Sequence, residues 1–148
     1  MRFDTVLKAA GASALAAFSC AGPALAQDDF HALNVVEGYW GWVVPDGENN
    51  PGSCEDDPVH IWLSEDRHYY YSEKEGSGES AEGPILSTDP RWIVIQYEGE
   101  ERLTEAGEPV AWVLFMDSRD EFRWIRRDWI GTGRSTYSLV RCNDVPAD

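Results

Sequence analysis

The sequence predicts an all-β domain, an antiparallel up-and-down meander of about eight strands closed into a barrel. Its apolar residues come in short runs with turn-forming residues between them, a pattern typical of all-β domains. The chain holds seven Trp, six Tyr and five Phe, which is too many large rings for a disordered acidic chain. Beyond residue 26 no stretch keeps a helical period, because Pro and Gly interrupt it throughout. An open β-sandwich is the main alternative.

Eight runs of apolar and aromatic residues are the candidate strands. In chain order they cover about 36–44, 58–64, 67–74, 81–87, 91–98, 109–117, 120–128 and 135–142. The breaks between them favour turns, because short polar side chains bond nearby backbone, glycine accepts positive φ, and proline restricts the residue before it. These breaks include SEDR (64–67), Gly76 and Gly78, Asp89-Pro90, DSRD (117–120) and GTG (131–133). Consecutive strands with short connections form a meander, and closing it into a barrel removes exposed edges.

Two of the runs indicate how the strands are buried. In PVHIWLS (58–64), Val59, Ile61 and Leu63 share one face. The run VAWVLFM (110–116) is apolar on both faces, so we expect other structure on both sides of that strand. A barrel of eight strands is at the size where the interior either fills with side chains or holds one small ligand.

The first 26 residues are typical of an export signal. Arg2 and Lys8 supply positive charge, an Ala-rich apolar stretch follows, and Ala24-Leu25-Ala26 gives a small-x-small cleavage pattern. The apolar stretch is too short to span a bilayer, so we expect a periplasmic or secreted protein without stable membrane insertion. A lipid anchor on Cys20 is the alternative. The expected organisation is a cleaved signal (1–26), a flexible tail (27–35) and a single domain (36–148).

Signal removal leaves two of the three cysteines, Cys54 and Cys142. In an exported chain we expect them to form one disulfide, worth about 4 kcal/mol in the chain-entropy model; two free buried thiols are the alternative. In a closed meander of eight strands Cys142 lies beside the start of the first strand, whereas Cys54 follows the end of that strand. Either the loop 45–57 folds back along the barrel, or the strand count is wrong by one.

Gly38-x-Trp40 in the first strand, the meander, and Arg141 near the end of the last strand resemble the lipocalin-like (calycin) barrels. The resemblance implies that Trp40 closes the base of the barrel and that Arg141 packs across its ring as a cation–π pair. The second lipocalin signature is absent and the chain is shorter than a full lipocalin. It is more similar to small exported bacterial proteins of this architecture.

Large rings and arginines supply the candidate binding residues. The expected lining of an apolar interior is Trp40, Trp42, Trp62, Trp92, Trp112 and Trp124. Six arginines cluster near the C-terminus: Arg119, Arg123, Arg126, Arg127, Arg134 and Arg141. With Trp124 and Trp129 they suit an anion- or carboxylate-binding face, or they pair with the many acidic residues on neighbouring strands. In HYYYS (68–72), Tyr69 and Tyr71 share one face and Tyr70 takes the other.

Other chemistry finds little support in the sequence. The acidic loop with Asp46, Glu48, Asn50 and Asp57 lacks the glycine and the helices of a calcium loop, and the three histidines lack metal-ligand spacing, so we expect no metal and no cofactor. No Gly-x-Ser-x-Gly turn is present, and we expect no enzyme. A net charge of −15 disfavours nucleic acid as a partner.

The expected function is binding of a small apolar or amphipathic ligand. The alternative is a protein-interaction or inhibitor module of the cell envelope with a packed, ligand-free core.

Overall fold

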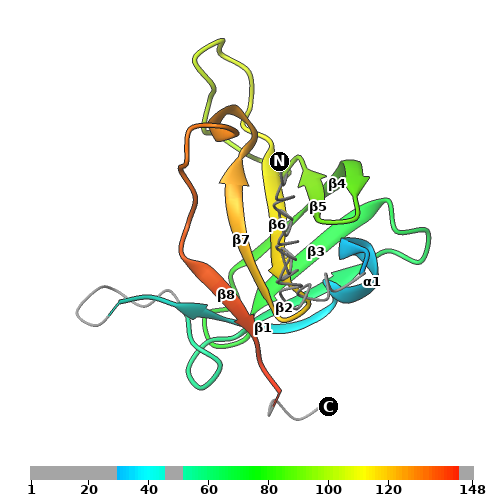
Figure 1. The fold of residues 1–148 in the computed structure, drawn as a ribbon, viewed down its shortest axis with the longest axis vertical. Coiled ribbons are helices and arrows are strands. Elements are labelled where there is room, and N and C mark those ends of the chain that lie inside the picture. Colours follow the sequence, from blue (N-terminus) through cyan, green and yellow to red (C-terminus); the bar gives the residue numbers. More distant parts are fainter. Residues whose placement is uncertain (1–29, 46–51, 144–148) are drawn as a thin grey trace, which may run out of the picture.

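The computed structural model describes residues 30–45 and 52–143, which form a closed antiparallel barrel (Figure 1). The strands are β1 (Gly38–Val43), β2 (Val59–Leu63), β3 (Tyr69–Lys74), β4 (Ser80–Asp89), β5 (Trp92–Ile95), β6 (Trp112–Ser118), β7 (Glu121–Arg126) and β8 (Ser138–Arg141). Each pairs with the next along the chain, and β8 returns to pair with β1. The predicted meander and its closure are confirmed, and the open sandwich is wrong.

Closure depends on β1, which pairs with a different neighbour along each half. Residues 38–40 pair with β2 in the backbone ladder, whereas residues 40–43 pair with β8, where Trp40 lies opposite Arg141. Along β1 the side chains alternate, so Trp40 and Trp42 point inward while Gly41 lies on the outer side. The strand therefore contributes an indole to each half of the barrel interior.

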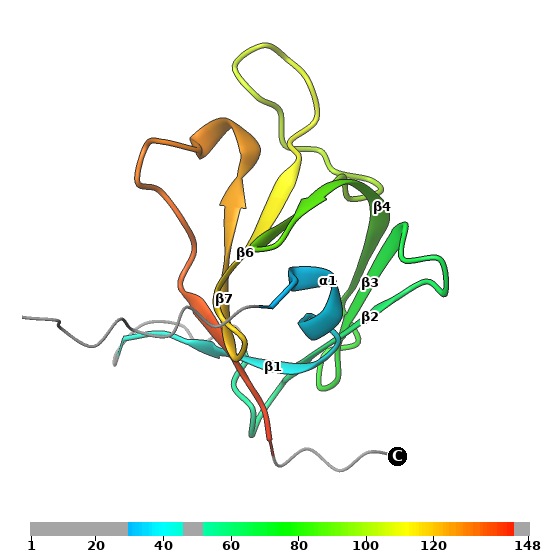
Figure 2. The ribbon, with the colours of Figure 1, turned by 45° about the vertical axis from the view of Figure 1, so that its right-hand side comes forward.

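One end of the barrel is closed by the segment before β1, which contains the helix α1 (Ala32–Val35). Figure 2 shows α1 lying across this mouth. Phe30, Ala32 and Val36 are buried, and the amide of Ala32 donates to the carbonyl oxygen of Pro90 at 2.7 Å. Arg67 donates to the carbonyl oxygen of Leu33 at 3.0 Å. From Phe30 onward, the segment expected to be a tail is packed, because its apolar side chains cover the base of the core.

Trp40 forms the centre of this closed end. Its ring is fully buried, meets Phe122 edge-on at 4.7 Å, and donates from Nε1 to the carbonyl oxygen of Val36 at 2.8 Å. The guanidinium of Arg141 lies 4.3 Å from the Trp40 ring, the arrangement that the resemblance implies. Arg141 also donates to Asp120 Oδ1 at 2.9 Å and to the carbonyl oxygen of Val35. It thus ties β8 to the segment that closes the barrel.

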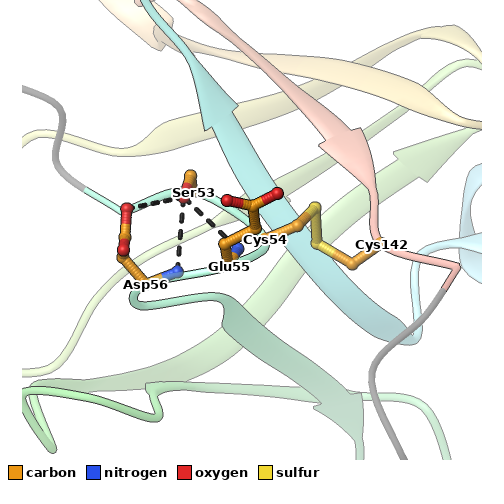
Figure 3. Close-up of a disulfide and its surroundings, with 5 residues drawn as sticks. All are labelled: Ser53, Cys54, Glu55, Asp56 and Cys142. Carbon is orange, nitrogen blue, oxygen red and sulfur yellow. Dashed lines mark hydrogen bonds between the residues drawn. A yellow bond between two sulfur atoms is a disulfide. The ribbon is translucent and has the colours of Figure 1, made fainter.

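The disulfide between Cys54 and Cys142 is confirmed, so the two are not free thiols (Figure 3). The chain folds back after β1, since the amide of Trp42 donates to the carbonyl oxygen of Gly52 at 2.7 Å. Cys54 then lies against the outer side of Gly41, where a Cβ atom would come within 2.5 Å of its amide nitrogen. The strand count of eight is therefore right, and the loop reaches back along β1 to meet Cys142.

Within the described parts of the chain, no helix is both long and apolar enough to cross a membrane.

Candidate functional site

The end of the barrel opposite α1 contains a hollow of about 220 Å³ between the inner faces of the strands. Five aromatic side chains line it: Trp42 from β1, Tyr70 from β3, Tyr97 just after β5, and Phe122 and Trp124 from β7. An adjoining recess of about 210 Å³ shares Trp42, Tyr97 and Trp124 and extends towards Trp112. The hollow and the recess together form one aromatic site at the open end, which we call the inner hollow.

The aromatic walls of the inner hollow are packed edge to face. Tyr70 lies 5.9 Å from Trp124 at an interplanar angle of 89°, and 5.9 Å from Tyr97 at 61°. Tyr97 and Trp124 are 5.8 Å apart, and Phe122 supports Trp124 from below at 5.7 Å. Such contacts fix the ring orientations.

Polar groups of Tyr70, Tyr97, Trp42 and the buried Ser72 lie in these apolar walls. Burial raises the pKa of the Tyr70 and Tyr97 phenols, so both stay neutral in ordinary buffers. The indole Nε1 of Trp42 is buried and has no hydrogen-bond partner among the described residues. An unsatisfied buried donor costs roughly 1–3 kcal/mol.

The rim of the inner hollow carries two ion pairs. Lys74 pairs with Glu79 on one side. On the other side Arg102 donates to both oxygens of Glu100, at 2.6 and 2.7 Å, and lies 4.7 Å over the Trp112 ring. Burial alone would raise the pKa of Glu100, but the hydrogen bonds from Arg102 and Trp112 outweigh it and lower that pKa. Glu100 is therefore an ionised structural anchor for the rim.

The six candidate tryptophans do not share one site. Trp42, Trp112 and Trp124 lie at the inner hollow, and Trp40 lies in the closed base. Trp62 and Trp92 lie on the outer side of the barrel, opposite Tyr71 and Phe115 respectively.

Two residues of the inner hollow, Tyr70 and Tyr97, were not among the candidates. Their signal was present: Tyr70 takes the face opposite Tyr69 and Tyr71, and Tyr97 continues the alternation of Ile93 and Ile95.

The outer side of β1, β2 and β3 carries a row of rings. Tyr39 stacks on His60 at 4.4 Å, and Trp62 stacks on Tyr71 at 5.5 Å and 7°. His60 links the two pairs at 5.1 Å from Trp62, and Tyr69 extends the row at 5.0 Å from Tyr71. These five half-buried side chains, the outer aromatic row, form a continuous surface over three strands.

The expectations about metals fall partly outside the described residues. Asp46, Glu48 and Asn50 of the acidic loop lie there, while the carboxylate of Asp57 accepts hydrogen bonds from the amides of Gly76 and Ser77 at 2.7 and 3.3 Å. Over residues 30–45 and 52–143, no group of three or more His, Cys, Asp or Glu side chains is placed to hold a metal ion.

Fold and site together define a class: a small closed antiparallel barrel with one end plugged by a helix and an aromatic hollow at the other. No protein-family model matches the chain, and searches of curated proteins and of solved structures give no match either.

Proposed function

We propose that this chain is an exported, non-enzymatic, lipocalin-like protein that binds a small apolar or amphipathic ligand in the inner hollow. The observation that carries the proposal is the hollow of about 220 Å³ walled by aromatic rings, beside which the buried Nε1–H of Trp42 has no partner among the described residues. Ligand pockets are mostly apolar with a few placed polar groups that fix orientation, and this hollow has that composition.

The size of the hollow sets the size of the ligand. A dry cavity of about 150 Å³ in another protein accommodates benzene. The hollow here is about 220 Å³, with an adjoining recess of about 210 Å³. A compact molecule of one or two fused rings fits this space. Because the Trp42 indole is a buried donor without a partner among the described residues, the ligand should carry one hydrogen-bond acceptor.

The test compares two ligands of nearly equal shape, 2-acetylnaphthalene and 2-ethylnaphthalene, of which only the first has an acceptor. We expect the first to bind about tenfold more tightly by calorimetry, since a hydrogen bond in a buried site is worth about 1–2 kcal/mol. The indole proton of Trp42 should shift in the nuclear magnetic resonance spectrum only with the first ligand.

Matched variants locate the site. Trp42→Phe keeps an aromatic ring but removes the donor, so it should erase the preference between the two ligands. Trp62→Phe makes the same chemical change on the outer side of the barrel and should leave both affinities unchanged. Binding of neither ligand, or a preference that survives Trp42→Phe, would overturn the proposal.

The outer aromatic row favours a second candidate function, a protein-interaction module of the cell envelope. A continuous row of half-buried rings on three strands offers the rigid aromatic contacts that are enriched at protein interfaces. Capture of an envelope protein that is lost with Trp62→Ala but retained with Trp42→Phe would support this function over the first. If Trp62→Ala, Trp42→Phe and the unchanged chain capture the envelope protein equally, the outer aromatic row is not the interaction surface.

A further inference from the structure

The outer side of β5, β6 and β7 carries a second apolar cluster, separated from the core by the barrel wall. Val94, Ala111 and Val113 are buried there, with Phe115 and Ile125 packed against them. The expectation that the run 110–116 has structure on both sides is therefore confirmed: Trp112, Leu114 and Met116 belong to the inner core and the alternate residues to the outer cluster.

A groove of about 540 Å³ lies over this outer cluster. Its floor is the outer face of the strands, including Val113 and Ile125, and its far wall is the segment 127–135. This segment leaves β7 through the short helix η1 (Arg127–Trp129) and returns to β8, as the orange loop in Figure 1 shows. Backbone hydrogen bonds hold the segment at both ends. The amide of Arg127 donates to the carbonyl oxygen of Ala111 at 2.8 Å, and the amide of Thr136 donates to the carbonyl oxygen of Trp124 at 2.9 Å.

The groove is basic in an acidic protein. Arg123, Arg127 and Arg134 line it, and no Asp or Glu is among its described lining residues, although the chain has a net charge of −15. An apolar floor beside concentrated positive charge suits a molecule with an apolar body and an anionic head. The overall negative field of the protein repels extended polyanions, so a single anionic group is favoured.

Two of these arginines have unused guanidinium groups. Among the described residues, the Arg127 and Arg134 side chains make no ion pair and no hydrogen bond, and Arg134 lies 5.7 Å from the Trp129 ring. Arg123 pairs with Asp117 at 2.6 Å through Nη2, but its buried Nε has no partner. Pairing with neighbouring acids, the alternative that the sequence left open, therefore accounts for Arg123, Arg126 and Arg141 but not for these two or for Arg119, which lies outside the groove.

We infer that this outer groove is a second binding site, for a small amphipathic carboxylate whose apolar body lies on Val113 and Ile125 and whose head group is held by Arg127 and Arg134. Guanidinium groups bind carboxylates through paired hydrogen bonds, and an apolar surround strengthens such charge-assisted bonds. A volume of about 540 Å³ lies within the usual range of small-molecule pockets. The site is independent of the inner hollow, because the barrel wall separates them.

The experiment uses three molecules with the same alkyl chain: decanoate, decan-1-ol and decylamine. Each is titrated into the oxidised protein by calorimetry below its aggregation limit. We expect decanoate to bind at least tenfold more tightly than the alcohol, because only decanoate engages the arginines, and the cationic amine to bind most weakly. Equal affinities for the three molecules would overturn the assignment of a carboxylate.

Arginine variants locate the site. The double variant Arg127→Gln with Arg134→Gln should weaken decanoate by at least tenfold and leave the alcohol unchanged. Neither side chain makes an ion pair or a hydrogen bond among the described residues, so the fold should persist, which melting and circular dichroism verify. The matched control is Arg119→Gln, an exposed arginine of the same cluster that lies outside the groove and should leave decanoate binding unchanged.

The remaining outcomes are equally decisive. Ile125→Ser, which removes apolar floor, should weaken both decanoate and the alcohol. If the double arginine variant binds decanoate like the unchanged protein, the groove is not the site. If Trp42→Phe abolishes decanoate binding while the arginine variant does not, the molecule occupies the inner hollow instead. If sedimentation shows a dimer that Ile130→Ser dissociates, the groove is a self-association surface and the inference fails.

Discussion

Removal of the disulfide should strongly destabilise the protein while leaving the barrel as its folded state. Cys54 and Cys142 are 88 residues apart, so the bridge closes a loop that contains most of the domain. The chain-entropy relation gives about 4.6 kcal/mol at 25 °C for a loop of this length. With an unfolding entropy of about 2.1 cal/mol/K per residue, that loss lowers Tm by roughly 15–20 °C.

The assay is chemical and thermal unfolding of the oxidised protein and of the variant with Cys54→Ser and Cys142→Ser. The eight-strand ladder does not include either cysteine, so far-ultraviolet circular dichroism of the folded variant should match the unchanged protein. If the free energy of unfolding falls by less than about 1 kcal/mol, the bridge does not act by restricting the unfolded chain, because that chain would then gain little freedom from its removal.

Gly41 tests the geometry of the same feature. A Cβ there would lie 2.5 Å from the amide nitrogen and 2.7 Å from Sγ of Cys54. Gly41→Ala should therefore cost about 1–3 kcal/mol in the bridged protein, as overpacking does. In the variant without cysteine sulfur atoms the covering segment can move away, and the cost should fall. An equal cost in both backgrounds would contradict the placement of Cys54 over β1.

Two further predictions use paired aromatic residues. Trp40→Phe removes the donor to the Val36 carbonyl oxygen and should lower the free energy of unfolding by about 2–4 kcal/mol. Trp42→Phe removes a donor without a partner and should lower it by about 1 kcal/mol or less, both measured by denaturant unfolding. Equal costs of the two variants would argue against an unsatisfied Trp42 donor. Burial raises the pKa of Tyr70 and of Tyr97, so their contribution to stability is present below about pH 10, where unfolded tyrosine is neutral, and is lost as pH rises above it. Absorbance at alkaline pH with parallel unfolding measurements checks this, and Tyr97→Phe should flatten the alkaline decline; a decline of the same slope in both proteins would refute it.

Local sequence determined the strands and their order. Each observed strand overlaps the run of residues that predicted it, because period-2 alternation and turn-forming residues act over a few positions. Alternation also placed Val59, Ile61 and Leu63 on one face, and all three belong to or pack against the inner core. The order of the strands followed from the short connections, which leave consecutive strands as neighbours.

Alternation alone did not decide which face of an aromatic strand points inward. Trp92 lies in a strand that is apolar on both faces, so its alternation is satisfied whichever face is inside. In β2, alternation puts Trp62 on the face opposite Val59, Ile61 and Leu63, but a large ring on that face left its direction open. Only the closed ladder, which places Trp62 opposite Tyr71 and Trp92 opposite Phe115, assigns both to the outer side. The inner hollow therefore contains fewer of the candidate tryptophans than the sequence indicated.

The sequence by itself thus determined an all-β meander, a disulfide and a cluster of arginines, since these depend on residue type and short-range spacing. Tertiary structure decided how three segments return to the barrel: residues 30–36 into one mouth, Cys54 against Gly41, and residues 127–135 over the outer face of β5 to β7. Each return is fixed by contacts between residues far apart in the chain, which local patterns do not encode. Those contacts separate the arginines that pair with acids from Arg127 and Arg134, and so create the outer groove.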